Sequence, residues 1–169
     1  MLTLTIISQY YKIRHIIHYE IIWGDIVEEH KNRGIIQFQT GKILHLDGDK
    51  KYSEKSIKYY RSLGLNAVVK YIPESKQAYV VKELLDKYEP DVLVITGHDS
   101  MIRKGTDYND IYNYRNSRYF IKTVNEARKW AKNKKQLAIF AGACQSYYEE
   151  MISAGANFAS SPRKNNDRF

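Results

Sequence analysis

One histidine and one cysteine occupy matching places in this chain. His98 follows the apolar run of residues 92–96, and Cys144, the only cysteine, follows the apolar run of residues 137–141. A glycine stands between each run and its reactive residue. A thiol becomes a strong nucleophile when it loses its proton, and a nearby imidazole commonly takes that proton. The pair therefore indicates nucleophilic catalysis by Cys144 with help from His98.

A structural explanation of the same residues stays open. A lone cysteine is often a small, buried apolar side chain with no chemical role, and a lone histidine is more often structural than catalytic. The matching positions of His98 and Cys144 directly after two apolar runs favour the chemical role.

The two apolar runs belong to an alternation of strands and amphipathic helices that begins near residue 41. Continuous apolar strands separated by helices are typical of a parallel sheet covered on both faces. The sequence therefore predicts an α/β fold, a doubly wound and mostly parallel sheet of about five strands flanked by helices. The expected strands are residues 43–46, 67–72, 92–96, 137–141 and 157–160. The expected helices are residues 53–63, 77–88, 117–131 and 146–153.

Residues 1–40 do not follow this alternation. They contain two short β-like pieces, at residues 23–27 and 34–38. We expect a small N-terminal β appendage over residues 1–40 and one α/β domain over residues 41–169.

Two helix starts are predicted from the residue types beside them. Ser53 is expected to cap the first helix, and Gly64 to end it, because serine and glycine favour those positions. The last helix is expected to begin near Ser146, so Cys144 would lie just before a helix N-terminus. Free backbone N–H groups and the positive end of the helix dipole would there stabilise a thiolate.

Polar side chains follow three of the predicted strands. Asp47 and Asp49 follow the first strand, His98 and Asp99 the third, and Cys144 the fourth. Ligands of doubly wound sheets bind outside the carboxyl ends of the strands, so an acid, a base and a thiol are expected on one rim. Asp47 and Asp49 fit two roles, an anionic pocket for a Lys or Arg side chain or a simple turn. Asp99 either orients His98 or caps the following loop.

The composition narrows the class of protein. The chain has 27 Lys and Arg against 19 Asp and Glu, a formal net charge of +8. The basic residues are scattered, which favours a solvated surface and no nucleic-acid partner.

One cysteine excludes an internal disulfide and a Cys-rich metal site, and we expect neither a metal nor a cofactor. Charged residues interrupt residues 1–23, so we expect no membrane span, no secretory signal peptide and a cytoplasmic protein. The sequence gives no indication of an oligomeric state.

Four segments resemble the YabG family of sporulation-specific proteases. An apolar strand ending at a histidine, followed later by an apolar strand ending at Ala-Cys, is also similar to the caspase-like cysteine peptidases. The resemblance to the YabG family spans residues 41–162. Its segments are residues 41–49, 85–99, 140–146 and 154–162.

The resemblance implies a caspase-like α/β domain that acts as a cysteine endopeptidase with His98 and Cys144 as its dyad. It also implies protein substrates, namely spore coat and cortex-related proteins cleaved near basic residues. The protein would then work in the mother-cell cytoplasm or on the forming spore coat. Members of the family extend further at both ends, so the chain is expected to be truncated at its C-terminus.

The same resemblance suggests where an oxyanion would be stabilised. The backbone N–H groups of Cys144 and of the turn from Gly97 to Asp99 are the expected donors. Gly142 is expected to support them by letting the backbone approach a substrate closely. The caspase-like pattern has a glycine directly after the histidine, where this chain has Asp99.

Two other functions are compatible with the sequence. One is a receiver-like signalling module, which is also a five-stranded doubly wound domain with acids after its first strand. A receiver has an aspartate at the end of the third strand and a lysine after the fifth, where this chain has His98-Asp99 and Arg163-Lys164. The other is an inactive remnant that only binds coat proteins.

Overall fold

The computed structural model describes residues 41–102, 107–134 and 136–161. They lie in one compact unit, Gly41–Phe169. The expected N-terminal β appendage, residues 1–40, lies outside the described residues, so that part of the domain organisation stays a prediction.

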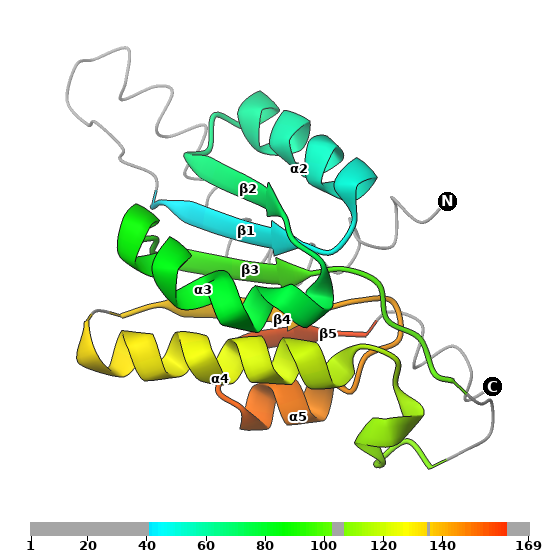
Figure 1. The fold of residues 1–169 in the computed structure, drawn as a ribbon. Coiled ribbons are helices and arrows are strands. Elements are labelled where there is room, and N and C mark those ends of the chain that lie inside the picture. The colour runs from blue at the N-terminus through cyan, green and yellow to red at the C-terminus, as the bar shows by residue number, and fades with distance from the viewer. Residues whose placement is uncertain (1–40, 103–106, 135, 162–169) are drawn as a thin grey trace, which may run out of the picture. The chain divides into compact units, whose positions relative to one another are not determined.

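A five-stranded parallel sheet forms the centre of this unit (Figure 1). Its strand order is β2-β1-β3-β4-β5, and every neighbouring pair is parallel. This is one of the common orders of doubly wound sheets, so the predicted α/β fold class is confirmed. The strands are β1 (Ile43–Asp47), β2 (Ala67–Tyr71), β3 (Val92–Thr96), β4 (Ala138–Gly142) and β5 (Phe158–Ser160).

Helices cover the two faces of the sheet unequally. The connection from β1 to β2 runs in the opposite direction along the sheet from the later ones, so right-handed crossovers place its helix on the opposite face. In the described part of the chain, α3 packs against α4, and α4 against α5, while α2 packs mainly against β2 and β1 (Figure 1). None of the described helices is long and apolar enough to span a membrane. The helices are α2 (Lys50–Ser62), α3 (Glu74–Tyr88), α4 (Ser117–Asn133) and α5 (Tyr148–Ser153), with a 3₁₀ turn, η1, at Ile111–Asn113.

Strand periodicity separates a face buried in the main hydrophobic core from a face that carries polar side chains toward its carboxyl end. Alternate side chains of a strand point to opposite faces. The side chains that face α3, α4 and α5 are fully buried and belong to one hydrophobic core. The intervening residues of β1 and the end of β3 are polar, namely His45, Asp47 and Thr96. The sheet residues that belong to the hydrophobic core are Leu44, Leu46, Leu93, Ile95, Ile139 and Ala141.

Both helix starts that were predicted from the neighbouring residue types are wrong, and α3 begins at Glu74 rather than at the expected residue 77. Helix α2 begins at Lys50 with Asp49 as its cap, because the Asp49 side chain accepts a hydrogen bond from the backbone N–H of Tyr52. Ser53 is instead buried in the first turn, where its hydroxyl donates to the carbonyl of Asp49. Gly64 does end the helix with a positive φ of 66°.

The other error concerns the helix after the cysteine. Helix α5 begins at Tyr148, not near Ser146, and has six residues. The effect of a helix dipole falls off within its first turn. The geometry therefore gives no support to a helix-stabilised thiolate at Cys144.

Gly142 is required by the neighbouring strand. It ends β4, and a Cβ atom at this position would overlap the backbone carbonyl oxygen of Ser160 in β5. The close approach of β5 explains the glycine without a substrate, and the supporting role expected for Gly142 stays a prediction.

We predict that Gly142→Ala lowers the free energy of unfolding by about 1–3 kcal/mol, because the backbone of β5 must move to admit the methyl group. Urea unfolding of the two proteins measures the difference. Gly41→Ala is the control, since its nearest obstacle is the Asp91 side chain at 3.2 Å, which needs to move by only a few tenths of an ångström. Equal losses in the two variants would contradict the explanation.

Candidate functional site

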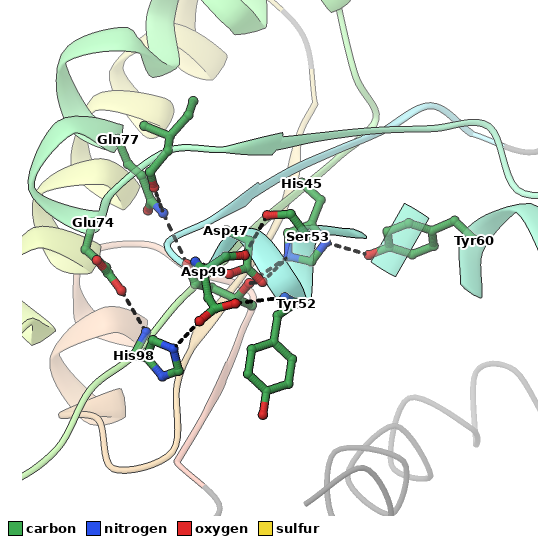
Figure 2. Close-up of polar contacts among 11 residues, drawn as sticks. His45, Asp47, Asp49, Tyr52, Ser53, Tyr60, Glu74, Gln77 and His98 are labelled. Carbon is green, nitrogen blue, oxygen red and sulfur yellow. Dashed lines mark hydrogen bonds and ion pairs between the residues drawn. The ribbon is translucent and has the colours of Figure 1, made fainter. Parts of the chain in front are cut away.

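His98 lies at the carboxyl rim of the sheet, two residues beyond the end of β3. Its Nε2 is 2.7 Å from Oδ2 of Asp49, the cap of α2, as Figure 2 shows. The imidazole also makes an edge contact with the ring of Tyr52, whose centroid is 5.9 Å away. The His98 side chain is 58% exposed, so these contacts, not burial, fix the ring.

The backbone of His98 is held on both sides. Its N–H donates to Oε1 of Glu74 at 2.7 Å, and its carbonyl accepts from the side-chain amide of Asn116 at 2.7 Å. The Glu74 side chain fits beside His98 only because Gly48 and Gly97 next to it have no side chains. A Cβ atom at either glycine would overlap the Glu74 carboxylate. Gly97 therefore makes room for Glu74. Glu74 could not be predicted from the sequence, because it begins α3, where no strand end or spacing distinguishes it.

Asp47 and Asp49 have different surroundings. Asp47 is 4% exposed and accepts from the hydroxyl of Thr96 at 2.8 Å and from the N–H of Asp49 at 2.7 Å. Burial raises the pKa of Asp47. The hydrogen bond from His98 is the main cause that lowers the pKa of Asp49. Asp47 is thus a buried acid that holds the turn, while Asp49 is the acid that meets His98.

A buried hydrogen-bond chain lies behind Asp47. His45 Nε2 is 2.6 Å from the hydroxyl of Thr96, and His45 Nδ1 is 3.2 Å from the hydroxyl of Tyr60 (Figure 2). Because Thr96 donates to Asp47, it must accept from His45, so Nε2 carries the imidazole proton and Nδ1 accepts from Tyr60. Burial lowers the pKa of His45 to about 4, so its 3.6 Å approach to Asp47 is not an ion pair at neutral pH.

Cys144 lies in the turn between β4 and α5. It is a free, half-buried thiol. Serine hydroxyls hold the backbone around it: the N–H of Ala143 donates to Ser146, and the N–H of Ser146 donates to Ser161. The turn is therefore fixed from both the β4 and the β5 side.

Asp99 joins the turn of His98 to the turn of Cys144. It is 6% exposed, and its carboxylate accepts from the hydroxyl of Ser117 at 2.5 Å and from the N–H of Asn116 at 2.8 Å. Burial raises the pKa of Asp99. Ser117 in turn accepts from the N–H of Tyr147, three residues after Cys144. Asp99 also accepts from the N–H of Ser100 at 2.9 Å, and these contacts favour its role as a cap of the following loop, one of the two roles expected for it.

The structure brings His98 and Asp49 into direct contact and places Cys144 on the next strand end. Thr96 and Gly142 are paired in register between the adjacent strands β3 and β4, and His98 and Cys144 each follow two residues later. No hydrogen bond joins the two side chains within the described residues. The described residues also contain no group of three or more His, Cys, Asp or Glu side chains able to hold a metal ion. The arrangement offers a thiol, an imidazole and a carboxylate, the groups of nucleophilic catalysis.

Two comparisons by sequence give matches. The family model described as YabG peptidase U57 matches residues 9–167. The sporulation-specific protease YabG of Bacillus subtilis (strain 168) is 48% identical over 126 residues, which are 75% of this chain and 43% of that protein. The chain thus spans less than half the length of that relative.

Solved structures similar to this chain include two receiver domains. The BeF3-activated N-terminal receiver domain of Klebsiella pneumoniae RstA has a TM-score of 0.46 and 13% identity, covering 72% of this chain and 85% of the domain. The receiver domain of the Francisella response regulator 1452 has a TM-score of 0.48 and 16% identity, covering 72% and 84%.

The buried imidazole predicts a loss of stability in mild acid. In the unfolded chain His45 takes up a proton near its ordinary pKa of 6.5, whereas in the folded chain its pKa is about 4. Because protons then favour the unfolded state, the contribution of neutral His45 is present above pH 6.5 and is lost as the pH falls to about 4. The loss amounts to about 3 kcal/mol. Urea unfolding at several pH values across this window measures it.

His45→Gln is the matched variant, because glutamine has no proton to gain in this range. Its overall stability is lower, but its stability should change less between pH 6.5 and pH 4 than that of the parent. Parallel pH curves for the two proteins would show that His45 is not the group responsible.

Proposed function

We propose that this chain, which belongs to the YabG peptidase U57 family, is a cysteine endopeptidase with Cys144 as nucleophile and His98 as base and acid. The observation that carries the proposal is the position of the two residues at the carboxyl ends of adjacent parallel strands in register. Parallel strands lie about 5 Å apart, so small side-chain movements bring the imidazole to the thiol or to a bound peptide.

The reaction would proceed in two halves. His98 takes the thiol proton, the Cys144 sulfur forms a bond to the scissile carbonyl carbon, and the C–N bond breaks as His98 returns the proton to the leaving amine. Water, activated by the same imidazole, then hydrolyses the thioester and frees Cys144. A hydrogen bond between thiol and imidazole need not exist in the free protein, because catalytic contacts often tighten only with substrate.

The developing oxyanion needs backbone donors. We place them at the N–H of Cys144 and at the turn from Gly97 to Asp99. The N–H of His98 already donates to Glu74, which leaves Gly97 and Asp99 as the donors of that turn.

The proposed substrates are spore coat and cortex-related proteins, cleaved after basic residues in the mother cell or at the forming coat. The relative's description as a sporulation-specific protease supports this class. Asp47 and Asp49 are the proposed source of the preference for Lys or Arg: Asp49 lies on the rim beside His98, and the buried Asp47 accepts a hydrogen bond from the backbone N–H of Asp49. Glu74 adds a third carboxylate there.

Cys144→Ala should abolish cleavage of a casein or spore-coat substrate, because it removes the nucleophile. The assay is gel or mass-spectrometric detection of fragments, with thermal unfolding as the check that the variant is folded. Turnover at the parent rate would rule out the mechanism.

Alkylation gives a second test that needs no substrate. Because Cys144 is the only cysteine, one iodoacetamide adduct per chain reports on it directly. We expect His98→Ala to slow the reaction near pH 7, since the imidazole no longer takes the thiol proton. An unchanged rate would separate His98 from the thiol chemistry.

The preference for basic residues is tested by Asp47→Asn and Asp49→Asn. We expect each change to lower the ratio of kcat/KM for peptides cleaved after Lys or Arg to that for matched peptides cleaved after a neutral residue. If neither ratio changes, these two acids are not the pocket.

A further inference from the structure

We infer that Asp49 is a positioning residue that orients His98 for its reaction with Cys144. The inference rests on the proposed function, because it assigns a task to the group that holds the proposed base. Its observation is the 2.7 Å contact between His98 Nε2 and Asp49 Oδ2 at the rim of the sheet (Figure 2).

The imidazole needs a partner to hold one orientation. Its side chain is 58% exposed, and its ring neighbour is Tyr52 in an edge contact. An exposed side chain of this kind rotates unless a hydrogen bond restrains it, and a charge-assisted bond is the stronger kind. Asp49 supplies that bond.

Asp49 is itself rigidly held. Its Oδ1 accepts from the N–H of Tyr52, its own N–H donates to Asp47, and its carbonyl accepts from the hydroxyl of Ser53. One carboxylate oxygen is thus fixed at the N-terminus of α2, which directs the other oxygen to His98. The sheet and the helix together set the position of the carboxylate.

The pairing selects the reactive nitrogen of the imidazole. An ionised carboxylate only accepts hydrogen bonds, so the neutral His98 ring carries its proton on Nε2 and keeps a lone pair on Nδ1. Nδ1 then takes the thiol proton from Cys144 and later passes it to the leaving amine, while Asp49 stabilises the intervening imidazolium and keeps its charge. The hydrogen bond from His98 is the first cause that lowers the pKa of Asp49, in agreement with an acid that stays ionised throughout.

The competing explanation is that Asp49 only caps α2. Two substitutions separate the roles, because Asn and Ser cap helices about as well as Asp. Asp49→Asn keeps the shape of the side chain and removes its charge. Asp49→Ser keeps a capping oxygen but is too short to reach His98. Both variants should fold with near-parent stability.

In the kinetic test, both variants should lower kcat by at least about tenfold, and up to about 10⁴-fold if the imidazole adopts the wrong tautomer. For peptides cleaved after a neutral residue KM should change little, so the loss of kcat on these peptides reports positioning, separately from the lower preference for Lys or Arg that the charge pocket predicts. The acid limb of the kcat/KM profile should move to lower pH, because the imidazolium loses its nearest carboxylate while Asp47 and Glu74 remain.

Asp110→Asn is the matched control. Asp110 caps η1 through a hydrogen bond from the N–H of Tyr112 at 2.9 Å, so it is a capping aspartate with no imidazole partner. Its substitution should leave kcat and the pH profile at the parent values. Parent-like kcat and an unmoved pH profile in both Asp49 variants would overturn the inference.

A spectroscopic readout keeps this test apart from that of the proposed function. Nitrogen-15 NMR of His98 reports its tautomer and its titration without any turnover, and it applies equally in a Cys144→Ala background. The inference predicts the Nε2–H tautomer in the parent and a loss of that preference in both Asp49 variants. If Cys144→Ala still cleaved substrate, the proposed function would fail while the NMR result still measured the pairing. An identical tautomer and titration in parent and variants would refute the pairing even in an active peptidase.

Discussion

The hydroxyl of Thr96 is the contact on which the rim of this sheet depends. It accepts from His45 and donates to Asp47, so it joins the ends of β3 and β1. The carbonyl of the same residue accepts from the N–H of Gly48 and from the side chain of Gln77. These bonds of Thr96 hold the turn after β1 against the end of β3. They therefore help to keep the carboxylate of Asp49 within hydrogen-bond distance of His98.

A second chain of polar contacts links the two turns on the other side. It runs from Asp99 through the hydroxyl of Ser117 to the backbone of Tyr147. Each of these groups is buried, and a buried polar group without a partner costs about 1–3 kcal/mol. The positions of His98 and Cys144 are therefore coupled through the start of α4 rather than through a direct bond between their side chains.

The sequence was sufficient for the fold because periodicity and apolar runs depend on local residue types. The strands around Leu44, Leu93 and Ile139 are all buried under helices as their apolar runs predict. The cap of α2 was misplaced because Ser53 and Asp49 are both good capping residues, and only the tertiary position of Asp49 at the end of β1 decides between them.

The partners of the candidate site were harder to predict. Asp49 and His98 are 49 positions apart, and nothing in either residue type specifies that a cap of α2 faces the end of β3. Glu74 fits beside His98 because Gly48 and Gly97 leave space for it, which is a property of three segments at once. Pairings of this kind follow from strand order, which the alternation of strands and helices leaves undetermined.

The hydrogen bond from the backbone N–H of Ser146 to the hydroxyl of Ser161 also makes the turn of Cys144 depend on a residue near the end of the described chain. A chain emerges from the ribosome with its N-terminus first, so His98 and Asp49 are available for pairing well before Ser161 has been made. Until then the backbone N–H of Ser146 lacks its acceptor and the turn of Cys144 lacks its support from the β5 side. The turn of Cys144 thus gains its full set of backbone hydrogen bonds only when the residue directly after β5 is in place.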